Sequence, residues 1–414
     1  MSLQQTPNAN RLHIGLFGKR NSGKSSIINA LTGQNVAIVS DVAGTTADPI
    51  YKPMELHGIG PVVFIDTAGF DDEGKLGELR VAKTKSAMDK TDIALMIFSA
   101  ESEDYSEELA WMEDFRKMNT PVIPVINKSD IIKDIADTSD NNFDKNTVNA
   151  LNRIPISEDE LSAMPIPVSA KNGDGIEGIR DAIINNLPED YESDSITGTL
   201  VNEGDRVLLV MPQDIQAPKG RLILPQVQTL RELLDKKCIV TSCTTDKLQS
   251  TLDSFKESPD LIITDSQVFK TVYELKPEGS KLTSFSVLFA AYKGDSEYFK
   301  GGAKHIENLS ENSRILIAEA CTHKPLNEDI GRVQLPKLLR KKLGDNLSID
   351  IVSGSDFPSD LSRYDLVITC GACMFNRKHV LSRVEKAKNQ NVPMSNYGIV
   401  IAYLNGILNK VSII

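Results

Sequence analysis

The first residues in this sequence that could do chemistry lie in a glycine-bearing run near the amino terminus. The run GKRNSGKS (18–25) fits the pattern G-x-x-x-x-G-K-[ST]. In this pattern, backbone N–H groups surround a phosphate chain, the lysine places a positive charge beside it, and the last hydroxyl reaches a Mg²⁺ ion. An apolar strand is expected before the run and a helix after it, as the motif requires. The predicted phosphate-binding residues are Gly18, Asn21, Ser22, Gly23, Lys24, Ser25 and Ser26.

Three further short motifs each follow a predicted strand: DTAG (66–69), NKSD (127–130) and SAK (169–171). Ligands bind at the carboxyl ends of the strands in open α/β sheets, so the three motifs are expected at one edge. At this edge, the aspartate of DTAG can reach the ligands around Mg²⁺, and the N–H of its glycine can reach the γ-phosphate. A second carboxylate can accept two N–H bonds from a guanine edge, which adenine does not offer. The predicted base-binding residues are Asn127, Lys128, Asp130, Ser169, Ala170 and Lys171.

The order and spacing of these motifs resemble the translation-factor class of GTPases. The resemblance implies Mg²⁺-dependent hydrolysis of GTP to GDP and phosphate. The expected catalytic residues are Lys24, Thr46, Asp66 and Gly69. The run GTT (44–46) resembles the first switch of that class, in which Thr46 rather than Thr45 senses Mg²⁺ and the γ-phosphate. Ser25 and Thr46 are therefore the expected Mg²⁺ ligands.

Two residues narrow the expected mechanism of hydrolysis. Phe70 follows DTAG at the place where Ras-like enzymes carry a glutamine that orients the attacking water, and an apolar ring cannot do this. Asn21 stands where TrmE-like GTPases place an asparagine that helps to hold K⁺. The resemblance implies a K⁺-activated GTPase, in which the cation replaces an arginine finger. The alternative is that Asn21 only shapes the loop and the enzyme is slow.

A second set of chemically active residues consists of cysteines in the last quarter of the chain. CTH (321–323) and CGAC (370–373) follow RILIAEA and DLVIT, which are both expected to be parallel strands. If these strands are neighbours, their carboxyl ends bring Cys321, Cys370 and Cys373 together. Three thiolates there suit Zn²⁺, with His323 as a fourth ligand, or a [4Fe–4S] cluster with one exchangeable position. The remaining interpretation is that they are small buried hydrophobes, as expected for Cys238.

Together, the GTPase motifs and the cysteine pattern resemble the HydF family, the GTPase scaffold of [FeFe]-hydrogenase maturation, over essentially all 414 residues. That family joins a K⁺-responsive GTPase domain, a dimerisation domain and a [4Fe–4S] domain with the signature C-x-H, a gap, then H-C-x-x-C. This sequence departs from the signature at Thr369, which stands where the family has a histidine. The fourth iron site is then left to His323, to an oxygen ligand, to water or to the cargo. The resemblance implies a homodimer that receives a diiron precursor from radical-SAM maturation enzymes and delivers it to apo-[FeFe]-hydrogenase.

These residues need an α/β framework to position them. The alternation of short apolar runs with amphipathic stretches predicts an α/β fold, a P-loop GTPase domain followed by two smaller α/β domains with mainly parallel sheets. Strands are expected at 12–17, 61–65, 93–98, 122–126, 166–168, 207–210, 238–241, 261–264, 315–318 and 366–369, and helices at 176–187 and 225–234. DLIIT (260–264) and DLVIT (365–369) indicate related βα units.

Local composition indicates where the chain is divided into domains. The acidic segment 188–204 is expected to be a linker, and PEGSK (277–281) a second boundary. The predicted domains span 8–188, 198–278 and 282–414. The resemblance to HydF implies that the first binds GTP, the second dimerises and the third binds the cluster.

The formal charge of −11 argues against broad binding to nucleic acids or anionic membranes. No apolar run approaches the ~20 residues that span a bilayer. The polar amino terminus and five sparse cysteines lead us to expect a cytoplasmic protein.

Two alternatives to the HydF interpretation remain. One is a TrmE- or Era-like GTPase in RNA modification or ribosome assembly, and the other is a GTPase with a structural zinc domain.

Overall fold

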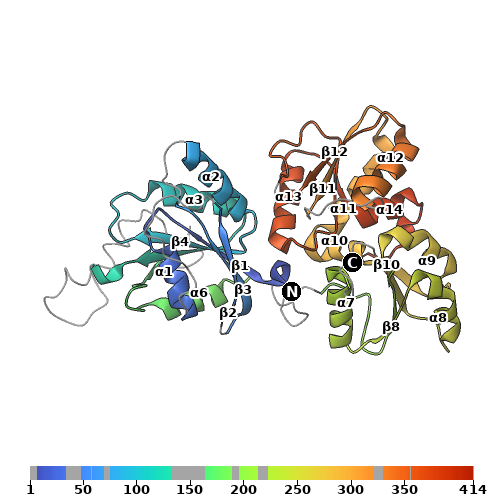
Figure 1. Cartoon of the computed structure of the whole chain (residues 1–414), viewed down its shortest axis with the longest axis horizontal. Helices are drawn as coiled ribbons and strands as arrows, with labels where there is room; N and C mark the ends of the chain where they lie inside the picture. Colours follow the sequence, from blue (N-terminus) through green and yellow to red (C-terminus); the bar gives the residue numbers. More distant parts are fainter. Residues whose placement is uncertain are drawn as a thin grey trace. The chain divides into compact units, whose positions relative to one another are not determined.

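The computed structural model describes residues 7–33, 48–56, 58–69, 75–131, 164–188, 195–212, 222–320, 330–354 and 356–413. The chain divides into two compact units, Met1–Tyr191 and Glu192–Ile414 (Figure 1). Four residues of the sequence predictions, Thr46, Phe70, Cys321 and His323, lie outside the described residues.

Unit 1 is built on a 6-stranded sheet with the order β2-β3-β1-β4-β5-β6. Its strands are β1 (Leu12–Phe17), β2 (Ile50–Leu56), β3 (Gly60–Asp66), β4 (Ile93–Ser99), β5 (Val122–Asn127) and β6 (Ile166–Pro167). Its helices include α1 (Lys24–Thr32), α2 (Lys75–Met88), α3 (Ser106–Lys117) and α6 (Ile176–Asn185). One core packs α1 and α6 on the sheet, and a second packs α2 and α3 on the opposite face. Because both faces are covered, β1, β4 and β5 are almost wholly apolar.

The strands predicted in unit 1 are confirmed to within about one residue at each end, but β2 was not predicted. This strand pairs antiparallel with β3 and forms the edge of the sheet. Its residues IYKPMEL alternate between exposed and buried positions and include Pro53, which an edge strand tolerates. The sequence therefore lacked the continuous apolar run that marked the other strands.

Unit 2 contains two 4-stranded sheets, β10-β9-β7-β8 and β12-β11-β13-β14, in which all neighbours are parallel. The first comprises β7 (Arg206–Val210), β8 (Ile239–Cys243), β9 (Leu261–Thr264) and β10 (Lys281–Ser284). The second comprises β11 (Arg314–Glu319), β12 (Ser348–Ser353), β13 (Leu366–Thr369) and β14 (Met394–Asn396). Numbered along the chain, both sheets run in the same order, 2-1-3-4, so the two halves share one topology.

The helices of unit 2 include α7 (Leu224–Asp235), α8 (Leu248–Ser254), α9 (Phe269–Leu275), α10 (Phe285–Lys293), α11 (Ser296–His305), α12 (Leu335–Leu343), α13 (Arg377–Asn389) and α14 (Tyr397–Leu404). Helices α10 and α14 each follow the fourth strand of a half and pack on one another. A single apolar core contains side chains of both halves, such as Leu282 and Val400. The two halves of unit 2 are therefore packed into one body.

The division of unit 2 differs from the predicted boundary in one respect. Strand β10 pairs with β9, so residues at the expected start of the last domain belong to the first sheet of unit 2. The short run KLTS was overlooked because it has only one strongly apolar residue.

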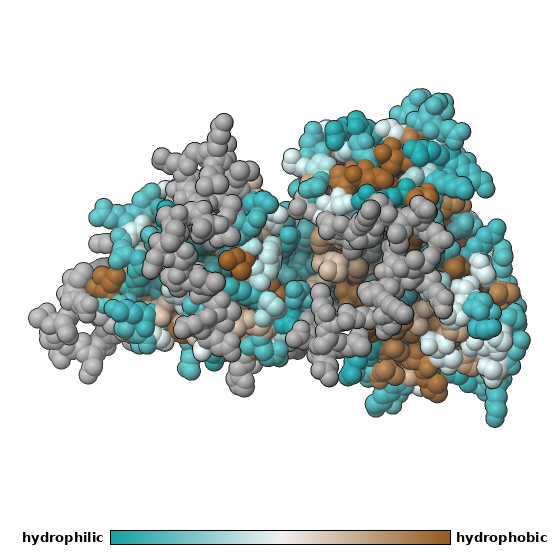
Figure 2. Space-filling model, viewed as in Figure 1, coloured by the Kyte–Doolittle hydropathy of each residue, from teal (hydrophilic) through white to brown (hydrophobic). Residues whose placement is uncertain are grey.

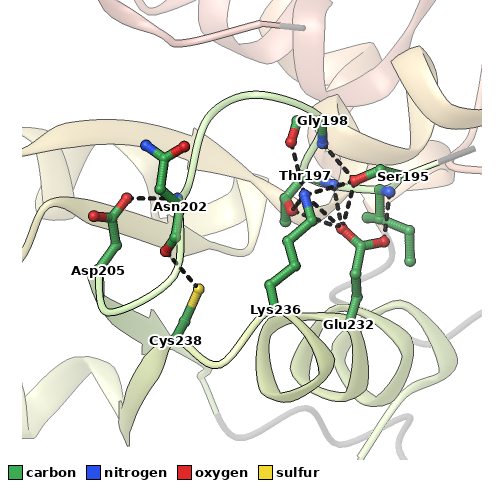
Figure 3. A network of polar contacts seen from close by, with 9 residues as sticks. Ser195, Thr197, Gly198, Asn202, Asp205, Glu232, Lys236 and Cys238 are labelled. Carbon is green, nitrogen blue, oxygen red and sulfur yellow. Dashed lines mark hydrogen bonds and ion pairs between the residues drawn. The ribbon is translucent and has the colours of Figure 1, made fainter.

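Part of the predicted linker is packed and hydrogen-bonded (Figure 3). The Glu232 carboxylate on α7 accepts bonds from Ser195 Oγ (2.9 Å), Ile196 N (2.6 Å), Thr197 N (2.8 Å) and Thr197 Oγ1 (2.6 Å). Lys236 Nζ donates to both of these hydroxyls and to the carbonyl oxygen of Gly198. Residues 195–198 are therefore fixed to α7.

No helix in the described part of the chain has the length and apolar character needed to cross a bilayer.

Candidate functional site

The predicted phosphate loop lies between β1 and α1, as the motif requires. Gly18 has a φ of +150° and Gly23 a φ of +92°. A Cβ on Gly18 would lie 2.4 Å from the carbonyl oxygen of Ile97, and one on Gly23 would lie 2.1 Å from Nδ2 of Asn127. Neither position accepts a side chain without a shift of backbone or of a buried amide, so both glycines are needed for the loop to close.

Lys24, the first residue of α1, is buried and folds back over the loop. Its Nζ donates to the carbonyl oxygens of Gly18 and Lys19, both at 2.8 Å. These carbonyls hold an ammonium group at the rim of the loop, where its charge is available to a phosphate. Asn21 lies in the same loop with an exposed side chain and a left-handed φ of +59°.

The ends of the loop and of β3 bring two oxygen donors together. Ser25 Oγ donates to Asp66 Oδ2 at 2.7 Å. A hydroxyl and a carboxylate are hard oxygen ligands of the kind that Mg²⁺ takes. Lys52 Nζ, on β2, lies 3.9 Å from the same Asp66 oxygen. Burial lowers the pKa of Lys52, and the Asp66 charge opposes this shift. The sequence analysis missed Lys52 because β2 was not predicted.

The two base-binding motifs meet through one side chain. Asn127 Nδ2 donates to the carbonyl oxygen of Ser22 at 2.9 Å, and its Oδ1 accepts the N–H of Ala170 at 3.1 Å. Asn127 therefore ties the phosphate loop to the SAK loop. Lys128 has a left-handed φ of +63° and pairs with Glu101. The Ser129 N–H donates to the carbonyl oxygen of Val168, which sets NKSD beside SAK.

The second predicted site lies at the carboxyl ends of β11 and β13. These strands are parallel neighbours, with Ala318 opposite Thr369, so the predicted adjacency is confirmed. Cys370 Sγ accepts the N–H of Ala320 at 3.1 Å and that of Ala372 at 3.4 Å. Ala320 precedes Cys321 in the sequence. Burial raises the pKa of the Cys370 thiol to about 11, against the lowering effect of the two N–H groups.

The loop after β13, the cysteine loop (370–375), contacts a buried lysine. Lys293 on α10 is 1% exposed, and its Nζ donates to the carbonyl oxygen of Phe375 at 2.6 Å. Burial lowers the pKa of Lys293 to about 8, although the nearby Cys373 and Cys370 oppose this shift. No sequence motif pointed to Lys293, which ends an apolar helix about 80 residues before the loop.

Neither Cys370 nor Cys373 forms a disulfide bond. Among the residues that the structure describes, no group of three or more histidine, cysteine, aspartate or glutamate side chains is arranged to hold a metal ion. Cys321 and His323 are not among these described residues. Cys238 is buried in an apolar cluster and its thiol contacts the carbonyl oxygen of Asn202, as expected for a core residue.

The fold and the first of these sites define a P-loop GTPase domain, and a family model described as 50S ribosome-binding GTPase matches residues 13–128. The rest of the chain matches the hydrogen maturase F dimerization domain at residues 196–294 and the hydrogen maturase F tetramerization domain at residues 297–413. These two models together cover more than half of the chain, and the chain belongs to the hydrogen maturase F (HydF) family.

Curated relatives match mainly the GTPase domain. A tRNA modification GTPase MnmE from Endomicrobium trichonymphae is 35% identical over 178 residues, which are 42% of this chain and 35% of that protein. A GTPase Der from Wolinella succinogenes is 42% identical over 125 residues, 29% of this chain and 26% of that protein. The chain thus spans about a third or less of the length of these two relatives. A solved structure of Era with MgGDPNP and 16S ribosomal RNA covers 56% of this chain and 92% of its own, at 21% identity and a TM-score of 0.36.

Proposed function

We propose that this chain is a GTP-operated carrier in [FeFe]-hydrogenase maturation, which holds a [4Fe–4S] cluster and carries a diiron precursor as cargo. It would receive the precursor from radical-SAM maturation enzymes and deliver it to apo-[FeFe]-hydrogenase. The observation that carries the proposal is that the N–H of Ala320 donates to Cys370 Sγ. Ala320 directly precedes Cys321 in the sequence, so the contact joins the chain just before one proposed cysteine ligand to the sulfur of another. Family membership and the GTPase domain support it.

GTP hydrolysis uses residues at the ends of β1, β3 and β5. Lys24 exchanges its loop carbonyls for phosphate oxygens when the nucleotide binds, because an ammonium beside phosphates gains more charge stabilisation than one beside carbonyls. Ser25 and Asp66 would hold Mg²⁺, with Thr46 as a further ligand, and the 2.7 Å contact between Ser25 Oγ and Asp66 Oδ2 supports this assignment. When bound, Mg²⁺ neutralises charge on the phosphates. The N–H of Gly69 is assigned to the γ-phosphate and Asp130 to the guanine edge.

Potassium activation is assigned to Asn21. Its exposed side chain in the phosphate loop presents an amide oxygen of the kind that binds K⁺. The GTP turnover of the wild type should be faster in KCl than in NaCl, and Asn21→Ala should lose this difference while keeping its affinity for GDP. Equal stimulation by K⁺ in both proteins would leave Asn21 as a loop former.

The cluster would be held by Cys321, Cys370 and Cys373, with His323 as the candidate fourth ligand. The N–H groups of Ala320 and Ala372 stabilise a thiolate on Cys370, as N–H bonds to sulfur do around iron–sulfur clusters. When bound, the cluster would supply an iron position that can exchange its ligand for cargo. Cytosolic reducing conditions would keep these thiols available.

We further propose a homodimer formed through β8. In the described part of its sheet, β8 pairs only with β7, so one edge of β8 is open to another strand. Ile239 on β8 is 59% exposed and Leu234 on α7 is 55% exposed, and Figure 2 shows apolar surface near this end of unit 2. A second copy would cover this patch and extend the sheet. Ile239→Lys is expected to shift the protein toward monomer in sedimentation velocity experiments, whereas an unchanged assembly would place the interface elsewhere.

The deciding experiment for the whole proposal is metal analysis of anaerobically reconstituted protein. Iron, sulfide and zinc are measured in the wild type and in Cys370→Ser, with EPR after reduction. About four irons per chain in the wild type, lost in the variant, is the result expected for a [4Fe–4S] cluster. Stoichiometric zinc without iron would replace the carrier function with a structural zinc domain.

An RNA-directed function is the competing proposal, because one relative is named a tRNA modification GTPase. The match to that relative covers 42% of this chain, whereas the hydrogen maturase F models match the chain from residue 196 to 413. We therefore favour hydrogenase maturation. RNA affinity that falls steeply with salt would revive the competing proposal.

A further inference from the structure

Helix α10 lies between the two halves of unit 2 (Figure 1). It follows β10, the fourth strand of the first sheet, and lies within residues 196–294, which match the hydrogen maturase F dimerization domain. The cysteine loop follows β13 of the second sheet and lies within residues 297–413, which match the hydrogen maturase F tetramerization domain. Any contact between α10 and the loop therefore joins the part of the chain assigned to dimerisation with the proposed cluster site.

The carboxyl-terminal end of α10 is bonded to the last part of the cysteine loop. Lys293 Nζ donates to the carbonyl oxygens of Phe375 (2.6 Å), Ala372 (3.4 Å) and Cys373 (3.4 Å). An ammonium has three N–H groups, so these three acceptors satisfy it. Ala372 has a left-handed φ of +48°, a conformation that residues other than glycine rarely adopt. The lysine therefore stabilises a loop conformation that the backbone alone disfavours.

The amino-terminal end of α10 is linked to the first residue of the same loop. Ser286 Oγ donates to Asn396 Oδ1 at 3.0 Å and accepts the N–H of Gly398 at 3.2 Å. Asn396 Nδ2 in turn donates to the carbonyl oxygen of Cys370 at 3.3 Å. A Cβ on Gly371 would lie 3.8 Å from Ser286 Oγ, so the loop passes directly over this end of the helix.

We propose that α10 holds the cysteine loop in its metal-binding conformation, with Lys293 as the positioning residue and Ser286 as the second support. The inference rests on the proposed cluster. The cluster site is then complete only when α10 is correctly packed on both halves of unit 2.

The test compares Lys293→Met, Lys293→Arg and Ser286→Ala with the wild type. Lys270→Met is the matched control, because this lysine on α9 has a side chain that is 72% exposed. After anaerobic reconstitution, loss of cluster absorbance to an iron chelator is followed in time. Lys293→Met is expected to lose its cluster about tenfold or more faster, because removal of an outer-shell partner weakens metal affinity by roughly tenfold or more at other metal sites. Lys293→Arg should lie between it and the wild type, and Ser286→Ala should change in the same direction.

A second readout needs no cluster. Alkylation of Cys373 by iodoacetamide in the cluster-free protein should accelerate in Lys293→Met and in Ser286→Ala, because the loop loses its supports, and should not change in Lys270→Met. Equal cluster lifetimes and equal alkylation rates in all variants would overturn the inference. A wild type that takes up no iron would instead overturn the proposed function, and the alkylation rates would still decide whether α10 shapes the loop.

Discussion

Asn127 joins the phosphate loop to the SAK loop, and its replacement is the sharpest test of the nucleotide site. The side chain is 3% exposed, and its amide makes one bond as a donor to Ser22 and one as an acceptor from Ala170. Asn127→Ala removes both bonds at once. It leaves the carbonyl oxygen of Ser22 and the N–H of Ala170 without these partners, and it removes the amide that packs against Gly23.

The size of the effect follows from the surroundings of the two orphaned groups. Ser22 is 1% exposed, so its carbonyl oxygen bears most of the cost of a buried unsatisfied group, about 1–3 kcal/mol. Ala170 is partly exposed, and water can replace its lost partner at a cost near 1 kcal/mol, the low end of the same range. Together these costs give about 2–4 kcal/mol. For a unit of this size, that corresponds to a fall in Tm of about 5–15 °C.

The assay is thermal unfolding of the full chain, monitored by a probe of the GTPase domain, without nucleotide and with excess GDP. Asn127→Asp is the matched variant, because it keeps the Oδ1 acceptor for Ala170 and replaces the donor to Ser22 with a second carboxylate oxygen, which can only accept. We expect Asn127→Asp to be destabilised, but to keep more of the GDP-induced rise in Tm than Asn127→Ala. A nucleotide-free Tm of Asn127→Ala within 1–2 °C of the wild type would refute the inferred link between the loops.

Four further predictions concern single side chains. Lys24→Ala should abolish GTP turnover while iron content is preserved, since the two sites lie in different units; loss of iron as well would contradict this separation. Asp130→Asn should weaken the preference for guanine, and unchanged discrimination against xanthosine nucleotides would count against its role. Lys52→Met removes a positive charge 3.9 Å from the Asp66 carboxylate and should tighten Mg²⁺ binding to the GDP complex by about tenfold, as measured by Mg²⁺ titration of a fluorescent GDP; weaker binding would show that Lys52 supports the site instead. In the cluster-free protein, alkylation of Cys370 should keep rising up to pH 11, because burial raises its pKa to about 11 and the thiolate is the nucleophile, whereas a plateau near pH 9 would indicate an exposed thiol.

The nucleotide site could largely be predicted from sequence because its residues are attached to strands with strong apolar signals. Lys24, Asp66 and Asn127 each lie within a residue or so of a strand or helix end, and parallel strands bring such ends to one edge. The adjacency of β11 and β13 followed from the same reasoning. The catalytic and binding roles given to these residues, to Thr46 and to Asn21 remain predictions.

The residues that sequence analysis missed are those whose partners are distant along the chain. Lys293 lies about 80 residues from the carbonyls that it contacts, and Lys52 lies on an edge strand with a weak pattern. Glu232 is an ordinary helical glutamate until the segment that begins at Ser195 folds onto it. Periodicity reports which face of an element is buried, but it does not report which partner covers that face.

The two halves of unit 2 share one topology, so the proposed cluster site is distinguished by a few residues and not by a special fold. The Asp260 carboxylate accepts the N–H of Arg206 at 2.7 Å, and the Asp365 carboxylate accepts that of Arg314 at the same distance. These equivalent bonds begin the equivalent stretches DLIIT and DLVIT, so the short sequence likeness reflects a shared topology.

The likeness extends to the carboxyl ends of the strands. Cys370 directly follows β13, whereas Asp265 directly follows β9 and accepts a bond from Gln226 at 2.9 Å. Helix α14 packs against the 3-10 turn Ser266–Val268 after β9, as α10 packs beneath the cysteine loop after β13. Each half thus supports the loop of the other, but only the loop after β13 carries thiols. A change in the packing of the first half, at the proposed dimer contact or in the segment fixed to α7, would therefore reach the cysteines through α10.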